Sequence, residues 1–209
     1  TTGTASFTPT DDSVYEGNET GVVAIDTVSG GSATEDGTQS VTITITENDS
    51  APTVTLTSSA SSIVENAGSS LTLTATLSNA TTADVTVGIS TSGTGTEGTD
   101  YATISDITIS AGATTGTASF TPTDDSVYEG NETGIVAIAS VSGGSATEDG
   151  AQSVTITITE NESSPTVTLT TSASSIAENA GTSLTLTATS SIVADEDITV
   201  TIGTGGGGT

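Results

Sequence analysis

An internal repeat constrains the fold of this chain more than any other feature. Residues 1–50 match residues 114–163 without a gap, with 45 identities in 50 positions, and residues 51–76 match residues 164–189 at the same offset of 113 residues. A fixed period means that one folding unit recurs along the chain. We therefore divide the chain into the C-terminal half of one repeat (1–50), a complete repeat (51–163) and the N-terminal part of the next (164–209).

This division leaves a half-repeat at each end of the sequence. One interpretation is that the chain is a window on a longer tandem array, which we favour because arrays of this kind are long. The other is that half-repeats of neighbouring molecules complete each other. Residues 1–50 and 164–209 together supply 96 of the 113 positions and lack the counterpart of 97–113.

Within the complete repeat, apolar residues alternate with threonine, as in Leu71, Leu73 and Ala75 and again in Val154 and Ile156. Alternation with a period of two is typical of β-strands that bury one face. Clusters of Gly, Ser, Asn and Asp separate the runs. Strands are expected over residues 53–64, 70–78, 85–91, 101–109, 115–121, 134–141 and 153–159. This pattern predicts an all-β fold, a tandem of immunoglobulin-like seven-stranded β-sandwiches with threonine on the outer faces.

The charge composition limits the partners and the chemistry of the chain. It has 26 Asp and Glu but no Lys, Arg or His, which gives a formal net charge of −26. Nucleic acid binding and membrane insertion are disfavoured, because the first needs basic residues and the second needs a long apolar run. A basic catalytic side chain and a Cys nucleophile are both missing, so we do not expect an enzyme. The expected partner is a cation.

Strand order predicts where the carboxylates gather. Successive strands of a sandwich run in alternate directions, so the connections after the odd-numbered strands of our prediction share one end. Nine of the 13 carboxylates in the complete repeat fall there. An excess of oxygen ligands without nitrogen or sulfur donors favours Ca²⁺ over Mg²⁺. The alternative is a solvated acidic surface. The nine are Glu65, Glu97, Asp100, Asp124, Asp125, Glu129, Glu132, Glu160 and Glu162.

Four motifs of the complete repeat resemble the Calx-beta domain family, which occurs in sodium/calcium exchangers and in large bacterial surface proteins. They are "SIVENAG" (62–68), "EGTDY" (97–101), "DDSVYEGNE" (124–132) and "VTITITENES" (154–163). The resemblance implies Ca²⁺ ligands at Glu65, Asp100, Asp124, Asp125, Glu129 and Glu132, with the Val127 carbonyl, Glu160, Asn161 and Glu162 as further candidates. The matching positions are Asp11, Asp12, Glu16, Glu19, Glu47 and Asp49 in the leading half and Glu178 in the trailing one. Affinity at the weak end of the range for extracellular modules, about 10⁻⁴ to 10⁻³ M, is expected.

Large apolar side chains flank the acidic loop at matched positions. Phe7 and Phe120 precede the two copies of the loop, and Tyr15 and Tyr128 lie within them. We expect all four to anchor the loop to the core beneath it.

A short linker brings one repeat close to the next. Only six residues (160–165) separate the strand that ends near Thr159 from the strand that begins near Thr166, and Pro165 stiffens this linker. The acidic end of one repeat then abuts the next repeat, where Asp195 and Asp197 are additional candidate ligands. We predict a structural, extracellular or cell-surface filament or adhesin stalk that Ca²⁺ makes rigid. Its partners would be neighbouring repeats and other copies, laterally or end to end. The alternative is a calcium-dependent module that binds a sugar or protein.

Overall fold

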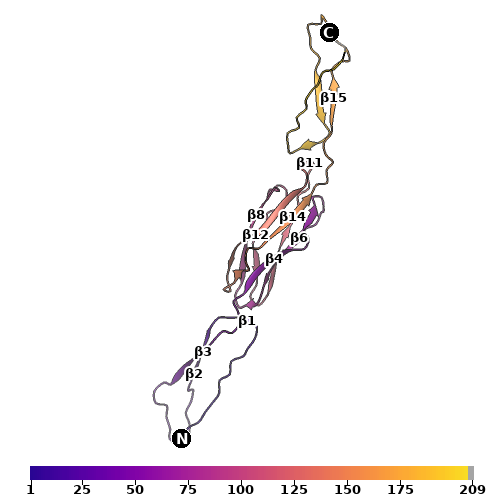
Figure 1. Ribbon diagram of the computed structural model, residues 1–209. Coiled ribbons are helices and arrows are strands. Elements are labelled where there is room, and N and C mark those ends of the chain that lie inside the picture. The colour runs from indigo at the N-terminus through magenta and orange to yellow at the C-terminus, as the bar shows by residue number, and fades with distance from the viewer. Residues whose placement is uncertain (207–209) are drawn as a thin grey trace.

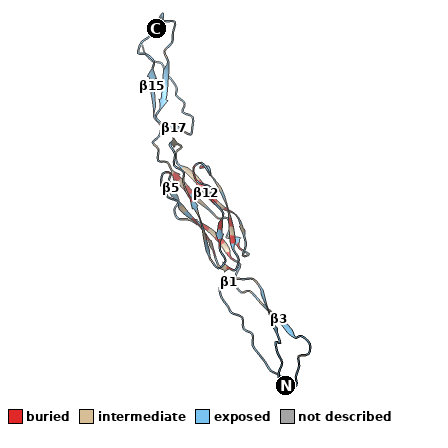
Figure 2. Ribbon diagram, turned by 180° about the vertical axis from the view of Figure 1, so that it is seen from behind, coloured by how far each residue is buried: buried red, intermediate tan, exposed pale blue. Residues whose placement is uncertain are grey.

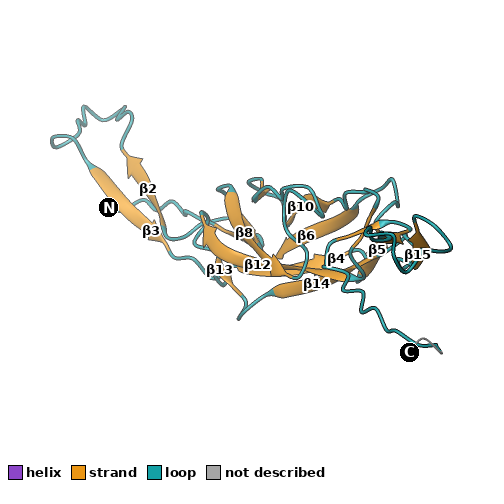
Figure 3. Cartoon of the chain, turned by 90° about the horizontal axis from the view of Figure 1, so that it is seen from above, coloured by secondary structure: helices purple, strands orange, loops and turns teal. Residues whose placement is uncertain are grey.

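The computed structural model describes residues 1–206, which form an elongated all-β chain (Figure 1). Residues 51–163 close into a sandwich at the centre of the rod, and the two termini lie at opposite ends. Figure 3 shows the leading hairpin projecting away from the central strands. Among the described residues, no helix is long and apolar enough to cross a membrane.

The complete repeat is an immunoglobulin-like sandwich of two sheets, as the alternation predicted. One sheet has the order β10 (Thr115–Phe120), β6 (Leu71–Leu77), β4 (Thr53–Ser58), β13 (Thr147–Glu148). The other has the order β5 (Ser62–Val64), β14 (Ser153–Thr159), β12 (Glu132–Ser142), β8 (Val85–Gly93), β9 (Ile107–Ile109). Within these sheets β5 runs parallel to β14 and β13 runs parallel to β4, while the other neighbouring pairs are antiparallel.

Two of the predicted strands are longer than the strands of the structure. The run 53–64 is not one strand, because the chain leaves one sheet after β4 and joins the other as β5. The run 101–109 contains only the short strand β9. Tyr101 makes an isolated bridge to Pro122 and buries its ring, so the segment before β9 serves the core without extended pairing. Periodicity could not distinguish these cases, because buried apolar residues recur in irregular segments as well.

The core lies between the two sheets of the complete repeat, where Figure 2 shows the buried residues. Aliphatic side chains fill most of it, and the rings of Tyr101 and Phe120 stack with their centroids 4.7 Å apart. Gly134 permits this arrangement, since a Cβ there would lie 2.7 Å from the Phe120 ring. Threonines occupy the outer face, where Thr115, Thr76 and Thr55 lie side by side across three strands.

The two half-repeats form hairpins without a closed core. β2 (Glu19–Ala24) pairs with β3 (Ser40–Ile45) in the register of β12 and β14, and β15 (Val167–Thr171) pairs with β16 (Leu186–Ser190) in the register of β4 and β6. Their apolar side chains remain exposed. The hairpin is therefore encoded locally, whereas burial needs the remainder of the sandwich.

Short parallel ladders join the repeats. β1 (Val14–Tyr15) pairs with β7 (Ala80–Thr81), and β11 (Val127–Tyr128) pairs with β17 (Val193–Ala194). Both ladders use the Val-Tyr dipeptide of the acidic loop and the equivalent segment of the following repeat. The backbone of each acidic loop is thus an attachment point for its neighbour.

Candidate metal centre

Strand direction brings five segments of the complete repeat to one end. β5 and β14 are parallel and end at Val64 and Thr159, and β12 runs antiparallel to β14 and so begins at that end with Glu132. β8 is antiparallel to β12 and ends there as well, and the loop after β10 contributes "DDSVYEG". The acidic end is therefore a product of topology, with ligands from connections far apart in sequence.

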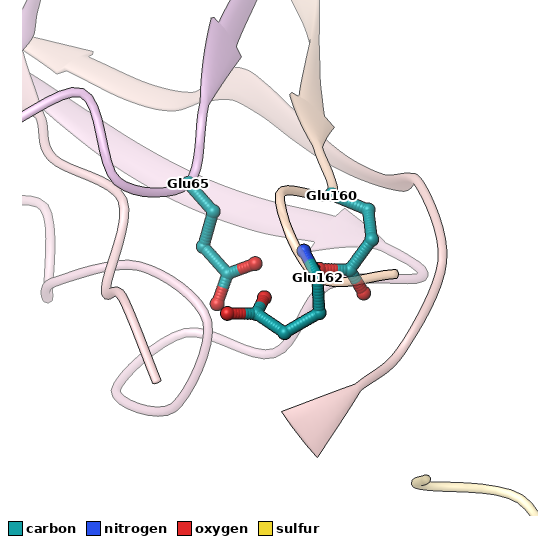
Figure 4. Close-up of side chains that lie close together, drawn as sticks. All are labelled: Glu65, Glu160 and Glu162. Atoms are coloured by element: carbon teal, nitrogen blue, oxygen red, sulfur yellow. The ribbon is translucent and has the colours of Figure 1, made fainter. Parts of the chain in front are cut away.

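Seven carboxylates at this end form three overlapping triads. In each triad, one oxygen of every member lies within 4.8 Å of the others. Glu65 belongs to the first two triads and Glu129 to the last two, so the three are continuous. Figure 4 shows the first triad, with Glu65 facing the two glutamates that follow β14. The triads are Glu65, Glu160 and Glu162; Glu65, Asp125 and Glu129; and Asp100, Glu129 and Glu132.

Glu160 organises the acidic loop through the backbone. Its Oε2 accepts hydrogen bonds from the N–H groups of Glu129 and Gly130 at 2.6 and 2.9 Å, and its Oε1 accepts from those of Asn161 and Glu162, both at 2.9 Å. Burial opposes ionisation, but these donors prevail and lower the pKa of Glu160 to about 2. The Asn131 side chain accepts from the Glu160 N–H at 3.0 Å. Glu160 is thus a fixed carboxylate that ties the loop to the end of β14.

In contrast to Glu160, Glu65 and Glu132 have raised pKa values. Burial, followed by repulsion from Glu160, Glu162 and Asp125, raises the pKa of Glu65 to about 7, although the Asp125 N–H donates to it at 3.2 Å. Burial, followed by repulsion from Asp100 and Glu129, raises the pKa of Glu132 to about 7. Without a cation, the site therefore resists full ionisation near neutral pH.

One carboxylate oxygen shows directly that a positive partner would fit. Oε2 of Glu162 is buried and has no hydrogen-bond partner among residues 1–206. The sequence has no basic side chain that could pair with it. The close side-chain contact with Glu160, followed by burial and by the charge of Glu160, raises the pKa of Glu162. The donor set consists of oxygen atoms in an irregular arrangement, which suits Ca²⁺ better than Mg²⁺.

Some predicted ligands lie beside the triads. Asp124 accepts a hydrogen bond from the Asn161 side chain at 3.4 Å, so both border the site. Val127 lies in strand β11, which pairs with β17, and its N–H donates to Asp125 at 2.6 Å. Glu97 has other partners, since its two oxygens accept from the Thr91 hydroxyl at 2.6 Å and from the Ile104 N–H at 2.7 Å. It stabilises its own loop.

The leading half reproduces part of this geometry. Asp11, Asp12, Glu16, Glu19, Glu47 and Asp49 line one hollow of about 40 Å³. Glu47 accepts the same four backbone hydrogen bonds as Glu160, at 2.6–2.9 Å, and they lower its pKa. Repulsion from Glu19, followed by burial, raises the pKa of Glu16. The loop therefore takes its shape without the rest of the sandwich.

The trailing half contacts the complete repeat near Asp195. The Asp195 N–H donates to the Tyr128 carbonyl at 3.1 Å, and the Asp195 charge helps to raise the pKa of Glu129 and Glu132. Asp197 lines a junction hollow of about 200 Å³ with Tyr128 and Pro165. Glu178 lies in an exposed turn of the trailing half and contacts none of the triads.

The aromatic prediction was right for Phe120 and wrong for Tyr128. Phe120 is fully buried, but Tyr128 is half-buried and faces Pro165 and the next repeat, and Tyr101 takes the expected place in the core. Phe7 and Tyr15 belong to the open half and are not buried. Sequence reasoning also missed the Glu160 hydrogen bonds and the ladders. The available signal was an Asn in the loop and a Glu after the strand, 29 residues apart in both copies. The two pairs are Asn18 with Glu47 and Asn131 with Glu160.

The comparisons with known proteins give one family match. The model of the Calx-beta domain matches residues 3–49 and 47–162. Among solved structures, one is the apo form of the Calx CBD1 domain, with 17% identity, a TM-score of 0.44, and coverage of 53% of this chain and 99% of that one. Another is CBD12 from CALX1.2, with 18% identity, a TM-score of 0.42, and coverage of 47% of this chain and 41% of that one. The search of curated proteins found no match.

Proposed function

Because this chain belongs to the Calx-beta domain family, whose members are known as calcium-binding domains, we propose that its acidic ends bind Ca²⁺ and that the bound ions stiffen the junctions between repeats. The candidate ligands of the complete repeat are the seven carboxylates of the three triads. Asp124, the Val127 carbonyl and Asn161 complete the set that the family resemblance implies. Asp195 adds a carboxylate from the following repeat.

This proposal rests on the observation that the acidic loop both supplies ligands and joins two repeats. Its side chains supply Asp125 and Glu129 to the triads, while its backbone forms the ladder to β17 in the next repeat. Mutual repulsion loosens a loop of this kind when no cation is present. Neutralising the carboxylates would fix the loop and, through the ladder, the orientation of the neighbouring repeat.

The biological role that we propose is structural. Two identical acidic loops lie 113 residues apart, and each joins its repeat to the following one through the same dipeptide. Such a chain suits a filament or adhesin stalk outside the cell, where calcium near the millimolar range would load sites with Kd of about 10⁻⁴ to 10⁻³ M. The regular spacing supports a spacer rather than a catalyst.

The first test is calcium titration of the whole chain by isothermal titration calorimetry. Glu132→Gln is expected to weaken binding roughly tenfold, since ligand charge sets calcium affinity. Asp106→Asn is the matched control, because Asp106 lies outside the triads and its Oδ1 accepts from the Ile89 N–H. Equal effects of the two substitutions would contradict the assignment.

The second test is the length of the chain measured by small-angle X-ray scattering. The maximum dimension should be larger and its distribution narrower with calcium than with EGTA. A chain that is equally stiff in both conditions would refute calcium stiffening, even if calorimetry shows binding.

A further inference from the structure

The chain enters the complete repeat at one end and leaves it at the other. β4 begins at Thr53, next to the junction with the preceding segment, and β14 ends at Thr159, next to the junction with the following one. Figure 1 shows these two segments at opposite ends of the sandwich. Tension along the chain therefore pulls β4 and β14 in opposite directions, and the pairing of these two strands decides how the repeat resists it.

Both of these strands lie inside their sheets. β4 lies between β6 and β13, and β14 lies between β5 and β12. An edge strand has one ladder and can be peeled away, whereas an inner strand leaves its sheet only when two ladders break. The short strands β13 and β5, which pair in parallel with β4 and β14, are what make them inner strands.

The ladder between β5 and β14 connects the two ends of the repeat directly. β5 follows β4 after three residues, and its Ser62 lies opposite Thr157 in β14. The Thr157 N–H donates to the Ser61 carbonyl at 2.9 Å, and the Glu65 N–H donates to the Thr159 carbonyl at 3.0 Å. Tension pulls the two strands past each other along their length. The hydrogen bonds then share the load and must break together, which slows forced unfolding.

We propose that the complete repeat bears mechanical load and that the β5–β14 ladder is the clamp that carries tension from one end of the repeat to the other. This function goes beyond stiff junctions, because it concerns the resistance of the sandwich itself. Its basis is the passage of the first strand from one sheet to the other. That passage sets the segment after β4 against the last strand, so the load need not pass through β8, β9 or β10.

The first carboxylate triad lies at the end of this clamp. Glu65 directly follows β5, whereas Glu160 and Glu162 follow β14, so the triad has members on both strands (Figure 4). Both oxygens of Glu160 already accept backbone hydrogen bonds, and Oε2 of Glu162 is buried without such a partner among residues 1–206. Calcium held by Glu65 and Glu162 would tie β5 to β14 where they must slide. This calcium bridge rests on the proposed function, whereas the clamp does not.

The clamp is tested by loading the full chain in two directions with optical tweezers, in EGTA. The chain has no Cys, so handles attach only at introduced ones. Handles at Ser50→Cys and Ser164→Cys load the clamp from opposite ends and shear it. Handles at Ala67→Cys and Ser164→Cys load β5 and β14 from the same end, so their hydrogen bonds break one at a time.

At equal force, loading from the same end should open the repeat roughly tenfold faster or more, because fewer hydrogen bonds break in each step. Each rate is divided by the unfolding rate of the same variant without load, which removes any difference in stability. Equal rates in the two directions, or faster opening under shear, would overturn the proposal.

The calcium bridge is tested in the shear direction, at a calcium concentration far above the Kd that calorimetry gives for each variant. At about 100 times Kd, calcium should slow opening by up to roughly a hundredfold. Glu162→Gln should remove most of this slowing. Glu132→Gln also removes a ligand charge, but it leaves the triad between β5 and β14 intact and should keep most of the slowing.

Calcium that binds in calorimetry but leaves the opening rate unchanged would refute the bridge, and so would equal losses in the two variants. A chain that binds no calcium would refute the proposed function and the bridge together. The directional test in EGTA decides the clamp in either case, because it involves no metal ion.

Discussion

Acidification in the presence of a calcium chelator should stabilise the complete repeat. Burial and the neighbouring carboxylates raise the pKa of Glu65 and of Glu132 to about 7, against an ordinary value of 4.5. Between these values the folded chain binds more protons than the unfolded chain, so stability increases as the pH falls. The full penalty is present above pH 7 and is relieved progressively toward pH 4.5.

The magnitude follows from the two pKa values. A change from 4.5 to about 7 corresponds to roughly 3 kcal/mol per group at full effect, and about 2 kcal/mol of it is regained between pH 7.5 and 5. Glu65 is only 6% exposed and should retain most of this. Glu132 is partly exposed, so solvent screening reduces its share to about 1 kcal/mol. The sum of about 3 kcal/mol raises the urea midpoint by roughly 1–2 M.

The assay is urea unfolding of the chain followed by far-UV circular dichroism, at several pH values in EGTA. The double substitution Glu65→Gln and Glu132→Gln should remove most of the pH dependence and stabilise the chain near pH 7.5, by roughly the same few kcal/mol. Asp106→Asn should leave the dependence unchanged. A calcium-free stability that is constant, or that falls from pH 7.5 to 5, would refute the electrostatic reasoning.

Three further outcomes are expected. Glu160→Gln should destabilise the repeat by about 2–3 kcal/mol in urea unfolding, because an amide cannot accept all four backbone hydrogen bonds; a loss no larger than that of Asp106→Asn would contradict this. Gly134→Ala should cost about 1–3 kcal/mol, because its Cβ would lie 2.7 Å from the ring of Phe120; an unchanged urea midpoint would show that the ring can move. Asp195→Pro removes the N–H that donates to the preceding repeat and should broaden the distance distribution in X-ray scattering with calcium. Asp195→Asn keeps the donor and should have a smaller effect.

The hairpins and the shape of the acidic loop form without the rest of the sandwich, and the hairpins were predicted from the sequence, whereas the hydrogen bonds to Glu160 were not. The same registers form in β2–β3 and β12–β14, although only the second pair has a closed core around it. The hydrogen bonds to Glu47 and Glu160 are likewise equivalent. Alternating apolar residues, turn glycines and a side chain within reach of nearby backbone suffice for these features. Strand parity also placed the acidic segments at one end, because direction follows from counting strands.

The exchange of the first strand between sheets was not accessible in this way. A switch from β4 to β5 leaves the alternation intact, because both sheets bury every second residue. The role of Tyr128 was missed for a related reason, since an aromatic residue in a loop can face the core or a neighbouring repeat. The partners of Glu97 were missed as well. Its carboxylate accepts hydrogen bonds from a hydroxyl and an N–H, and the spacing of residues in the sequence does not show that these donors lie beside it.

The sequence alone determined the repeat, the alternation of the strands and an uncompensated acidic charge, because these depend on residue order and composition. The tertiary structure decided which carboxylates share a site. It made Glu65 a member of two triads and joined the acidic loop to the following repeat through β11 and β17. Within the part of the chain that the structure describes, it also left Oε2 of Glu162 buried without a hydrogen-bond partner. The physical reason is that burial and distances between residues from separate connections are set by the packing of the two sheets, and no local pattern contains that information.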